Sequence, residues 1–379
     1  MKILYLISFY DIKDGSSDAL YSQIKDPANP HYLVICKWLN TAQDDIKILE
    51  YDDKIIDNII THEKFDLIHY FKSRSSNILD LVVKKLCKHK IKLPIVTTTC
   101  QNPSFGPYML SPYEIKNTSH FVFIDRTSFN DSLIKFIPDH NKSLIYLSAE
   151  DTLINRTENI KPKLKGGKDP VIFGRGSTLL KCPSDMFDVF DAIDIPNKEL
   201  HIVGVPLDGN WVHKEAEKRK NVKMFGYLPF DEWFNICKTF DVFLYQLPEY
   251  CHASLDGNLG LAMLMRIPVV YYGCEAPKER FISGENGFVA NTKEQFTRYA
   301  TDLGLNPNLR LAIGENGRNS TIKQFSYKNR IADYNKIYHS IKKTRHNGIR
   351  IPLKYWLTYL PKNWRRLVHG LTGYYRGPK

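Results

Sequence analysis

Two basic residues follow an expected buried strand in the second half of the chain. The run Ile172-Phe173-Gly174-Arg175-Gly176 comes directly off that strand, and Lys181 lies six residues after Arg175. A guanidinium can hold a phosphate group with two parallel hydrogen bonds and an ammonium adds a point charge, so the pair suits a diphosphate. Because surface Arg and Lys are common, spacing alone leaves open both phosphate binding and a solvated pair.

A second possible anion site lies near the N-terminus, where the strand expected at 2–8 runs toward Gly15. Glycine permits a tight turn there, and a helix after it would present free N–H groups and the positive end of its dipole. The segment lacks the spacing G-x-G-x-x-G, so an ordinary glycine turn is the alternative.

Carboxylates precede an apolar helix expected at 258–266. Glu249 and Asp256 could accept hydrogen bonds from sugar or ribose hydroxyls, and Gly257 and Asn258 lead into the helix. The alternative is that Asp256 or Asn258 only caps this helix.

A histidine lies in a strand of the first half, in the run Phe65-Asp66-Leu67-Ile68-His69-Tyr70-Phe71. An imidazole can orient a substrate hydroxyl or act as a base at neutral pH. The alternative is a structural histidine with both nitrogens satisfied.

These residues belong to a chain of 379 residues, a length that predicts two domains. With 43% hydrophobic and 25% charged residues, a disordered or low-complexity protein is excluded. The seven cysteines form no C-x-x-C pair, so neither a disulfide framework nor a zinc site is indicated. The first apolar run is too short for a signal peptide or a membrane span, and we expect a cytoplasmic protein.

Short apolar runs alternate with amphipathic segments, which is the pattern of parallel α/β sheets. The expected strands are 2–8, 46–51, 67–71, 94–98, 121–124 and 144–147, followed by 170–173, 199–203, 222–225, 242–245 and 268–272. We therefore expect two Rossmann-like doubly wound domains facing across a cleft, at 1–155 and 170–326, joined by a linker at 156–169. A helix at 327–345 would cross back to the first domain, and 346–379 forms a tail.

The order of several segments resembles the donor domain of GT-B glycosyltransferases, especially the retaining family-4 group. The resemblance covers about 165–340 and rests on the segments GRGSTLLK, HIVGVP, KMFGYLPFDEWFNICKTFDVFLYQ, DGNLGLAMLMRIPVV, SGENGFVA and FSYKNRIADYNKIY. It implies a nucleotide sugar as donor substrate, no further cofactor and no metal, and no D-x-D occurs at a strand end. Arg175 and Lys181 would then hold the nucleotide diphosphate and stabilise its charge during transfer, with Gly15 and Gly174 nearby.

Two family features differ here. The family usually has two glutamates eight residues apart, and that register falls on Ala253 and Leu261, so Glu249 and Asp256 are proposed as substitutes. The strand with His69 is similar to the family's D-x-x-H-x-H strand on the acceptor side, but Phe71 occupies the second histidine position. A sugar-nucleotide epimerase of the same fold and an inactive scaffold therefore stay as alternatives.

The C-terminal tail combines basic and apolar residues. Residues 334–379 contain eleven of the 53 Lys and Arg residues and no acid. Two stripes at helical spacing run through it: Leu353, Trp356, Leu357 and Leu360, then Trp364, Leu367, Val368 and Leu371. Such a segment is typical of a helix on an anionic membrane surface, with Trp356, Trp364, Arg365 and Arg366 as contacts.

The alternative for the tail is that both stripes pack on the protein's own first domain. No nucleic-acid-binding motif accompanies the charge, so nucleic acid is not an expected partner. The combined prediction is a peripheral enzyme at the cytoplasmic face of a membrane that adds a sugar to a lipid-linked, cell-surface glycan such as a lipopolysaccharide or capsule.

Overall fold

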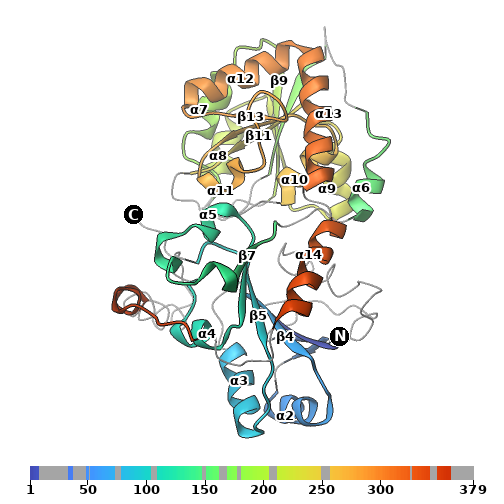
Figure 1. The fold of residues 1–379 in the computed structure, drawn as a ribbon. Helices are drawn as coiled ribbons and strands as arrows, with labels where there is room; N and C mark the ends of the chain where they lie inside the picture. Colours follow the sequence, from blue (N-terminus) through green and yellow to red (C-terminus); the bar gives the residue numbers. More distant parts are fainter. Residues whose placement is uncertain are drawn as a thin grey trace. The chain divides into compact units, whose positions relative to one another are not determined.

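The chain forms two compact units, Met1–Leu147 with Arg330–Lys379 (unit 1) and Ser148–Asn329 (unit 2) (Figure 1). The computed structural model describes residues 1–7, 33–36, 48–50, 52–72, 78–103, 109–146, 151–161, 169–176, 181–204, 211–248, 257–324, 327–341 and 348–359.

Unit 1 contains a seven-stranded parallel sheet with the order β3-β2-β1-β4-β5-β6-β7. Its strands are β1 (Ile3–Ile7), β2 (Leu33–Cys36), β3 (Ile48–Glu50), β4 (Leu67–Lys72), β5 (Ile95–Thr99), β6 (His120–Phe123) and β7 (Lys142–Leu144). The direction of winding reverses between β1 and β4, which makes the sheet doubly wound.

Alternate residues of the unit 1 strands face opposite layers of helices. Leu4 and Leu6 pack with buried residues of α2 (Asp53–His62) and α3 (Ile78–Lys88). Ile3, Tyr5 and Ile7 face α14 (Tyr327–Ser340), which returns from unit 2. Unit 1 also holds shorter helices at α4 (Pro112–Asn117), α5 (Arg126–Phe129), η2 (Ser132–Ile134), η3 (Asp139–Asn141) and 353–359.

Unit 2 repeats this topology in six parallel strands with the order β10-β9-β8-β11-β12-β13. They are β8 (Val171–Gly176), β9 (Lys198–Val203), β10 (Val222–Gly226), β11 (Val242–Gln246), β12 (Val269–Tyr272) and β13 (Phe288–Val289). The winding reverses between β8 and β11.

Helices cover both faces of the unit 2 sheet. On one face pack α7 (Met186–Asp191), α8 (Trp211–Glu217) and α12 (Lys293–Leu305), and on the other α9 (Phe230–Cys237) and α10 (Gly257–Leu264). The remaining helices are α6 (Asp151–Arg156), α11 (Glu275–Lys278) and α13 (Pro307–Gln324). Two doubly wound α/β sheets, as the sequence predicted, are therefore present.

The segment 151–161 belongs to unit 2, although the predicted division assigns its first part to the N-terminal domain. Arg318, which is buried in α13, donates hydrogen bonds to the Thr157 hydroxyl at 2.7 Å and to the Ile154 carbonyl at 3.1 Å. These contacts attach the segment to unit 2 before β8 begins. The predicted cleft between the domains stays a prediction.

Candidate functional site

The predicted cations lie at the reversal point of the unit 2 sheet, where ligands bind in doubly wound folds. Arg175 is near the carboxyl end of β8, and the neighbouring strand β11 ends at Gln246. Lys181 follows β8 closely in the chain, five residues after Gly176.

The Arg175 side chain is held by neutral backbone groups. Its Nη2 donates to the Gln246 carbonyl at 2.7 Å and to the Lys181 carbonyl, and only 4% of the residue is exposed. Its Nε has no hydrogen-bond partner among the residues that the structure describes. Neutral carbonyl groups do not compensate the charge of a buried guanidinium, so an anion beside it is favoured.

Lys181 contributes a second cation to the same strand ends. Its Nζ lies 3.4 Å from the hydroxyl of Tyr245, the residue before Gln246. Because the Lys181 backbone carbonyl also accepts from Arg175, one short segment positions both cations. Arg and Lys together can bind adjacent phosphates.

The glycines of this region have different roles. A Cβ on Gly174 would lie 1.9 Å from the Phe240 ring, so packing in the core requires glycine there. A Cβ on Gly176 would lie 3.3 Å from Nδ2 of Asn258, which places the start of α10 beside the end of β8. A Cβ on Gly257, the first residue of α10, would meet nothing within 4 Å.

The start of α10 therefore adds a helix N-terminus to the two cations. The body of α10 is anchored in the core through Leu259, Leu261 and Leu264. The N–H groups of its first turn provide partial positive charge for an anion. Three of the predicted donor-binding residues, Gly15, Glu249 and Asp256, lie outside the described residues.

Sequence reasoning missed two residues that support Arg175. The buried Gln246 side chain donates from Nε2 to Oδ1 of Asp185 at 3.1 Å, and Asp185 forms an ion pair with Lys293. These contacts fix the strand end whose carbonyl accepts from Arg175. Asp185 is 61 residues from Gln246 in the chain, so no local spacing could reveal the connection.

His69 lies in the interior of unit 1 with no exposed surface. Nδ1 is 2.6 Å from the Tyr338 hydroxyl, and Nε2 is 2.8 Å from the Thr98 hydroxyl, which in turn is 2.9 Å from the Tyr334 hydroxyl. Burial, and secondarily the charge of Arg330, hold the pKa of His69 well below its ordinary value. These contacts match the structural alternative, in which a neutral histidine links β4 and β5 to α14.

The SGENGF segment, the most specific part of the family resemblance, is explained by local packing. Asn286 accepts from the Ile282 backbone N–H at 2.7 Å and donates to the Arg280 carbonyl at 3.0 Å. Gly284 has φ of +87°, a conformation that favours glycine, and a Cβ on Gly287 would lie 2.5 Å from the Phe281 ring. The motif thus stabilises the turn before β13.

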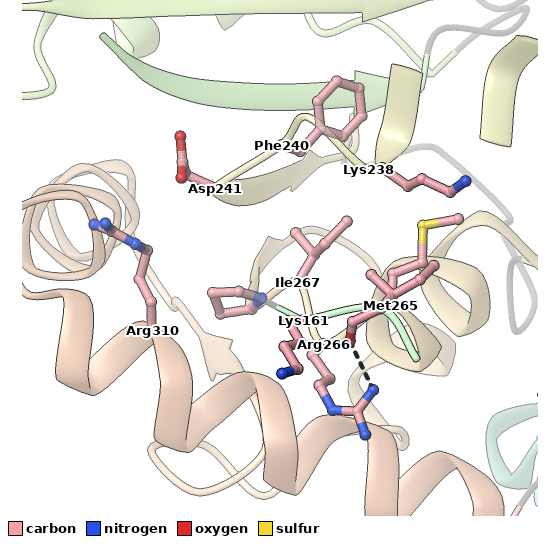
Figure 2. Close-up of a pocket in the computed structure, with 10 residues that line it drawn as sticks. Lys161, Lys238, Phe240, Asp241, Met265, Arg266, Ile267 and Arg310 are labelled. Atoms are coloured by element: carbon pink, nitrogen blue, oxygen red, sulfur yellow. Dashed lines mark hydrogen bonds between the residues drawn. The ribbon is translucent and has the colours of Figure 1, made fainter. Parts of the chain in front are cut away.

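A pocket at the amino ends of β11 and β12 lies apart from the predicted site (Figure 2). Its two arginines donate to backbone carbonyls: Arg266 to that of Ile160 at 2.9 Å, and Arg310 to those of Leu303 and Gly304 at 2.8 and 2.6 Å. Both arginines therefore form structural hydrogen bonds within unit 2.

The tail is described as far as residue 359. Trp356 is half-buried in the helix 353–359, whereas Trp364, Arg365 and Arg366 lie outside the described residues. None of the described helices has the length and apolar composition that crossing a membrane requires. Within the described residues, no three His, Cys, Asp or Glu side chains are grouped to hold a metal ion.

Comparison with known proteins connects this fold to glycosyltransferases. No protein-family model matches the sequence. An uncharacterized glycosyltransferase of Methanocaldococcus jannaschii is 27% identical over 235 residues, a match that spans 59% of this chain and 59% of that relative.

Solved structures match over most of the chain. HepE of Anabaena in complex with UDP has a TM-score of 0.70 at 16% identity, covering 90% of this chain and 100% of its own. A glycosyltransferase from Rickettsia africae has a TM-score of 0.70 at 16% identity, with 90% and 98% covered. WaaG, a glycosyltransferase involved in lipopolysaccharide biosynthesis, has a TM-score of 0.62 at 13% identity, with 90% and 99% covered. The chain has the fold of the GT-B glycosyltransferases.

Proposed function

We propose that the protein is a glycosyltransferase that moves a sugar from a nucleotide-sugar donor to a lipid-linked, cell-surface glycan. The observation that carries the proposal is the buried Arg175 guanidinium at the reversal point of unit 2, with Lys181 and the start of α10 beside it. Similar folds occur in HepE bound to UDP-glucose and in WaaG of lipopolysaccharide biosynthesis, which supports this donor and acceptor class.

In the proposed reaction a hydroxyl of the acceptor attacks C1 of the donor sugar. The bond from C1 to the diphosphate oxygen breaks as the new bond forms, and negative charge develops on the departing nucleoside diphosphate, one of whose oxygens takes up the proton of the acceptor hydroxyl. Arg175 and Lys181 stabilise that charge with charge-assisted hydrogen bonds, and the remaining catalysis is positioning. The resemblance to family 4 favours retention at C1.

Peripheral association with the cytoplasmic face of a membrane completes the proposal. Residues 334–379 carry eleven Lys and Arg residues and no acid. Each base near an anionic surface contributes about 1 kcal/mol, and a lipid-linked acceptor would be presented there.

A product assay tests the proposed activity. The full chain is incubated with UDP-, GDP-, CMP- and dTDP-sugars, with and without a lipid extract of membranes from the protein's source organism. We expect one of the UDP-, GDP- or dTDP-sugars to release its nucleoside diphosphate only when the lipid extract is present, together with a lipid product heavier by one sugar. Conversion of the donor without lipid would indicate the epimerase alternative, and no donor binding at all would indicate a scaffold.

A further inference from the structure

The helix 353–359 has its two tyrosines and its two leucines on opposite faces. Tyr355 and Tyr359 are buried in a hydrophobic cluster of unit 1. Leu353 and Leu357 are 72% and 63% exposed, and Trp356 beside them is half-buried. Residues four apart share one helix face, so the two tyrosines and the two leucines form two separate stripes.

The tyrosine stripe attaches the helix to unit 1. The Tyr355 hydroxyl donates to the Leu110 carbonyl at 2.6 Å, and its ring lies 5.2 Å from that of Phe136. Ile115 of α4 belongs to the same cluster, and Figure 1 shows the short red helix near α4. Because these contacts hold the opposite face, Leu353 and Leu357 are directed outward on a fixed support.

Basic residues accompany this outward face. Arg350 and Lys354 are exposed on the same segment. No acid occurs in 334–379. Exposed leucines and a tryptophan flanked by bases are the composition of a helix in the interface of an anionic bilayer. Two copies of this face would repel each other, which disfavours a second copy as the occupant.

We propose that Leu353, Trp356 and Leu357 form the face through which unit 1 contacts an anionic bilayer. This inference rests on the membrane part of the proposed function and deepens it, because it assigns the contact to unit 1 and to an anchored helix. The basic residues attract the headgroups, while the leucines enter the interface.

Vesicle sedimentation of the full chain tests the assignment. The double variant Leu353→Glu/Leu357→Glu is compared with Leu305→Glu, a matched control because Leu305 is 62% exposed in α12 of unit 2. We expect the double variant to bind vesicles of 30% phosphatidylserine in phosphatidylcholine at least about tenfold more weakly. The control should bind like the wild type, and all proteins should bind phosphatidylcholine vesicles poorly. Equal binding by the double variant would overturn the proposal.

Three further measurements distinguish a bilayer contact from misfolding and from self-association. Thermal unfolding should be unchanged in the double variant; if its midpoint falls, the milder Leu353→Ser/Leu357→Ser variant repeats the comparison. Light scattering that shows a wild-type dimer converted to monomer by the substitutions would assign the face to self-association and overturn the proposal. Binding of UDP, GDP, CMP, ADP and dTDP reports on unit 2 separately, so loss of vesicle binding with intact nucleotide binding supports this surface whatever sugar is transferred.

Discussion

Gln246 acts on the candidate donor site through its backbone and its side chain together. Its carbonyl accepts from Arg175, and its side chain is fixed by Asp185. We predict that Gln246→Ala weakens nucleoside diphosphate binding about three- to tenfold and lowers the free energy of unfolding by about 1 kcal/mol. Titration calorimetry and urea unfolding measure the two effects.

Asn235→Ala is the control for this change, because Asn235 accepts from Lys238 on the exposed surface of α9. It should leave nucleotide affinity unchanged. If Gln246→Ala binds nucleotide as tightly as the wild type does, the Arg175 guanidinium does not depend on this support.

Only part of the candidate site could be predicted from sequence at the level of residues. Arg175 and Lys181 follow a buried strand, and the carboxyl end of a parallel strand is a binding position, so local pattern identified them. Gln246 has no such marker, because its function depends on partners 61 and 71 residues away. His69 fits both a base and a structural residue until its two buried partners, Tyr338 and Thr98, are known.

At the scale of elements, His69 connects α14 to the unit 1 sheet and makes that connection sensitive to acid. The folded protein keeps His69 neutral because burial and the charge of Arg330 lower its pKa, whereas the unfolded chain binds a proton below about pH 6.5. Protons therefore favour the unfolded state, and stability falls as pH decreases from 6.5 toward the lowered pKa, by up to about 1.4 kcal/mol per pH unit.

His69→Gln removes this contribution. We predict that the difference in free energy of unfolding between wild type and variant narrows by about 1 kcal/mol between pH 7 and pH 5.5. Burial lowers the pKa of His120 to about 4 and raises the pKa of Asp80 to about 6, and both groups titrate in the wild type and in the variant. Their contributions to the difference in free energy of unfolding therefore cancel. A constant difference across this range would show that the folded protein can protonate His69.

The packing of α13 requires glycine at one position. A Cβ on Gly314 would lie 2.1 Å from the Arg266 carbonyl oxygen, which is backbone and cannot rotate away. We predict that Gly314→Ala destabilises unit 2 by about 2 kcal/mol or more, despite alanine's higher helix propensity. Asn319→Ala, at an exposed position of the same helix, should be close to neutral in the same urea titration. Equal stability of the two variants would contradict this packing.

Most strands could be predicted because apolar runs alternate with amphipathic segments along the chain. Strands that are short, or whose residues also fit a helix, were missed. β1, β4 and β5 lie within a residue or two of the predicted ranges. β13 has two residues, Phe288 and Val289, which is too short to give a period. β2 at Leu33–Cys36 was not predicted, because a four-residue apolar run fits a helix equally well.

At the scale of the whole molecule, two units of the same topology carry different chemistry. Unit 2 places cations and a helix start at its reversal point, whereas the described reversal region of unit 1 has His69 in its core and Lys72 in a buried ion pair with Glu114. Nucleotide binding should therefore depend on unit 2, and contact with a membrane on unit 1.

The most direct test of the central claim is calorimetric titration of the wild type and Arg175→Ala with UDP, GDP, CMP, ADP and dTDP. We predict that a nucleoside diphosphate binds the wild type and that Arg175→Ala weakens it at least about tenfold, since a charge-assisted hydrogen bond contributes about 1.5–3 kcal/mol. Any ligand that binds should also raise the unfolding temperature by mass action. Unchanged affinity in Arg175→Ala, or no binding of any nucleotide to the wild type, would contradict a donor site in unit 2.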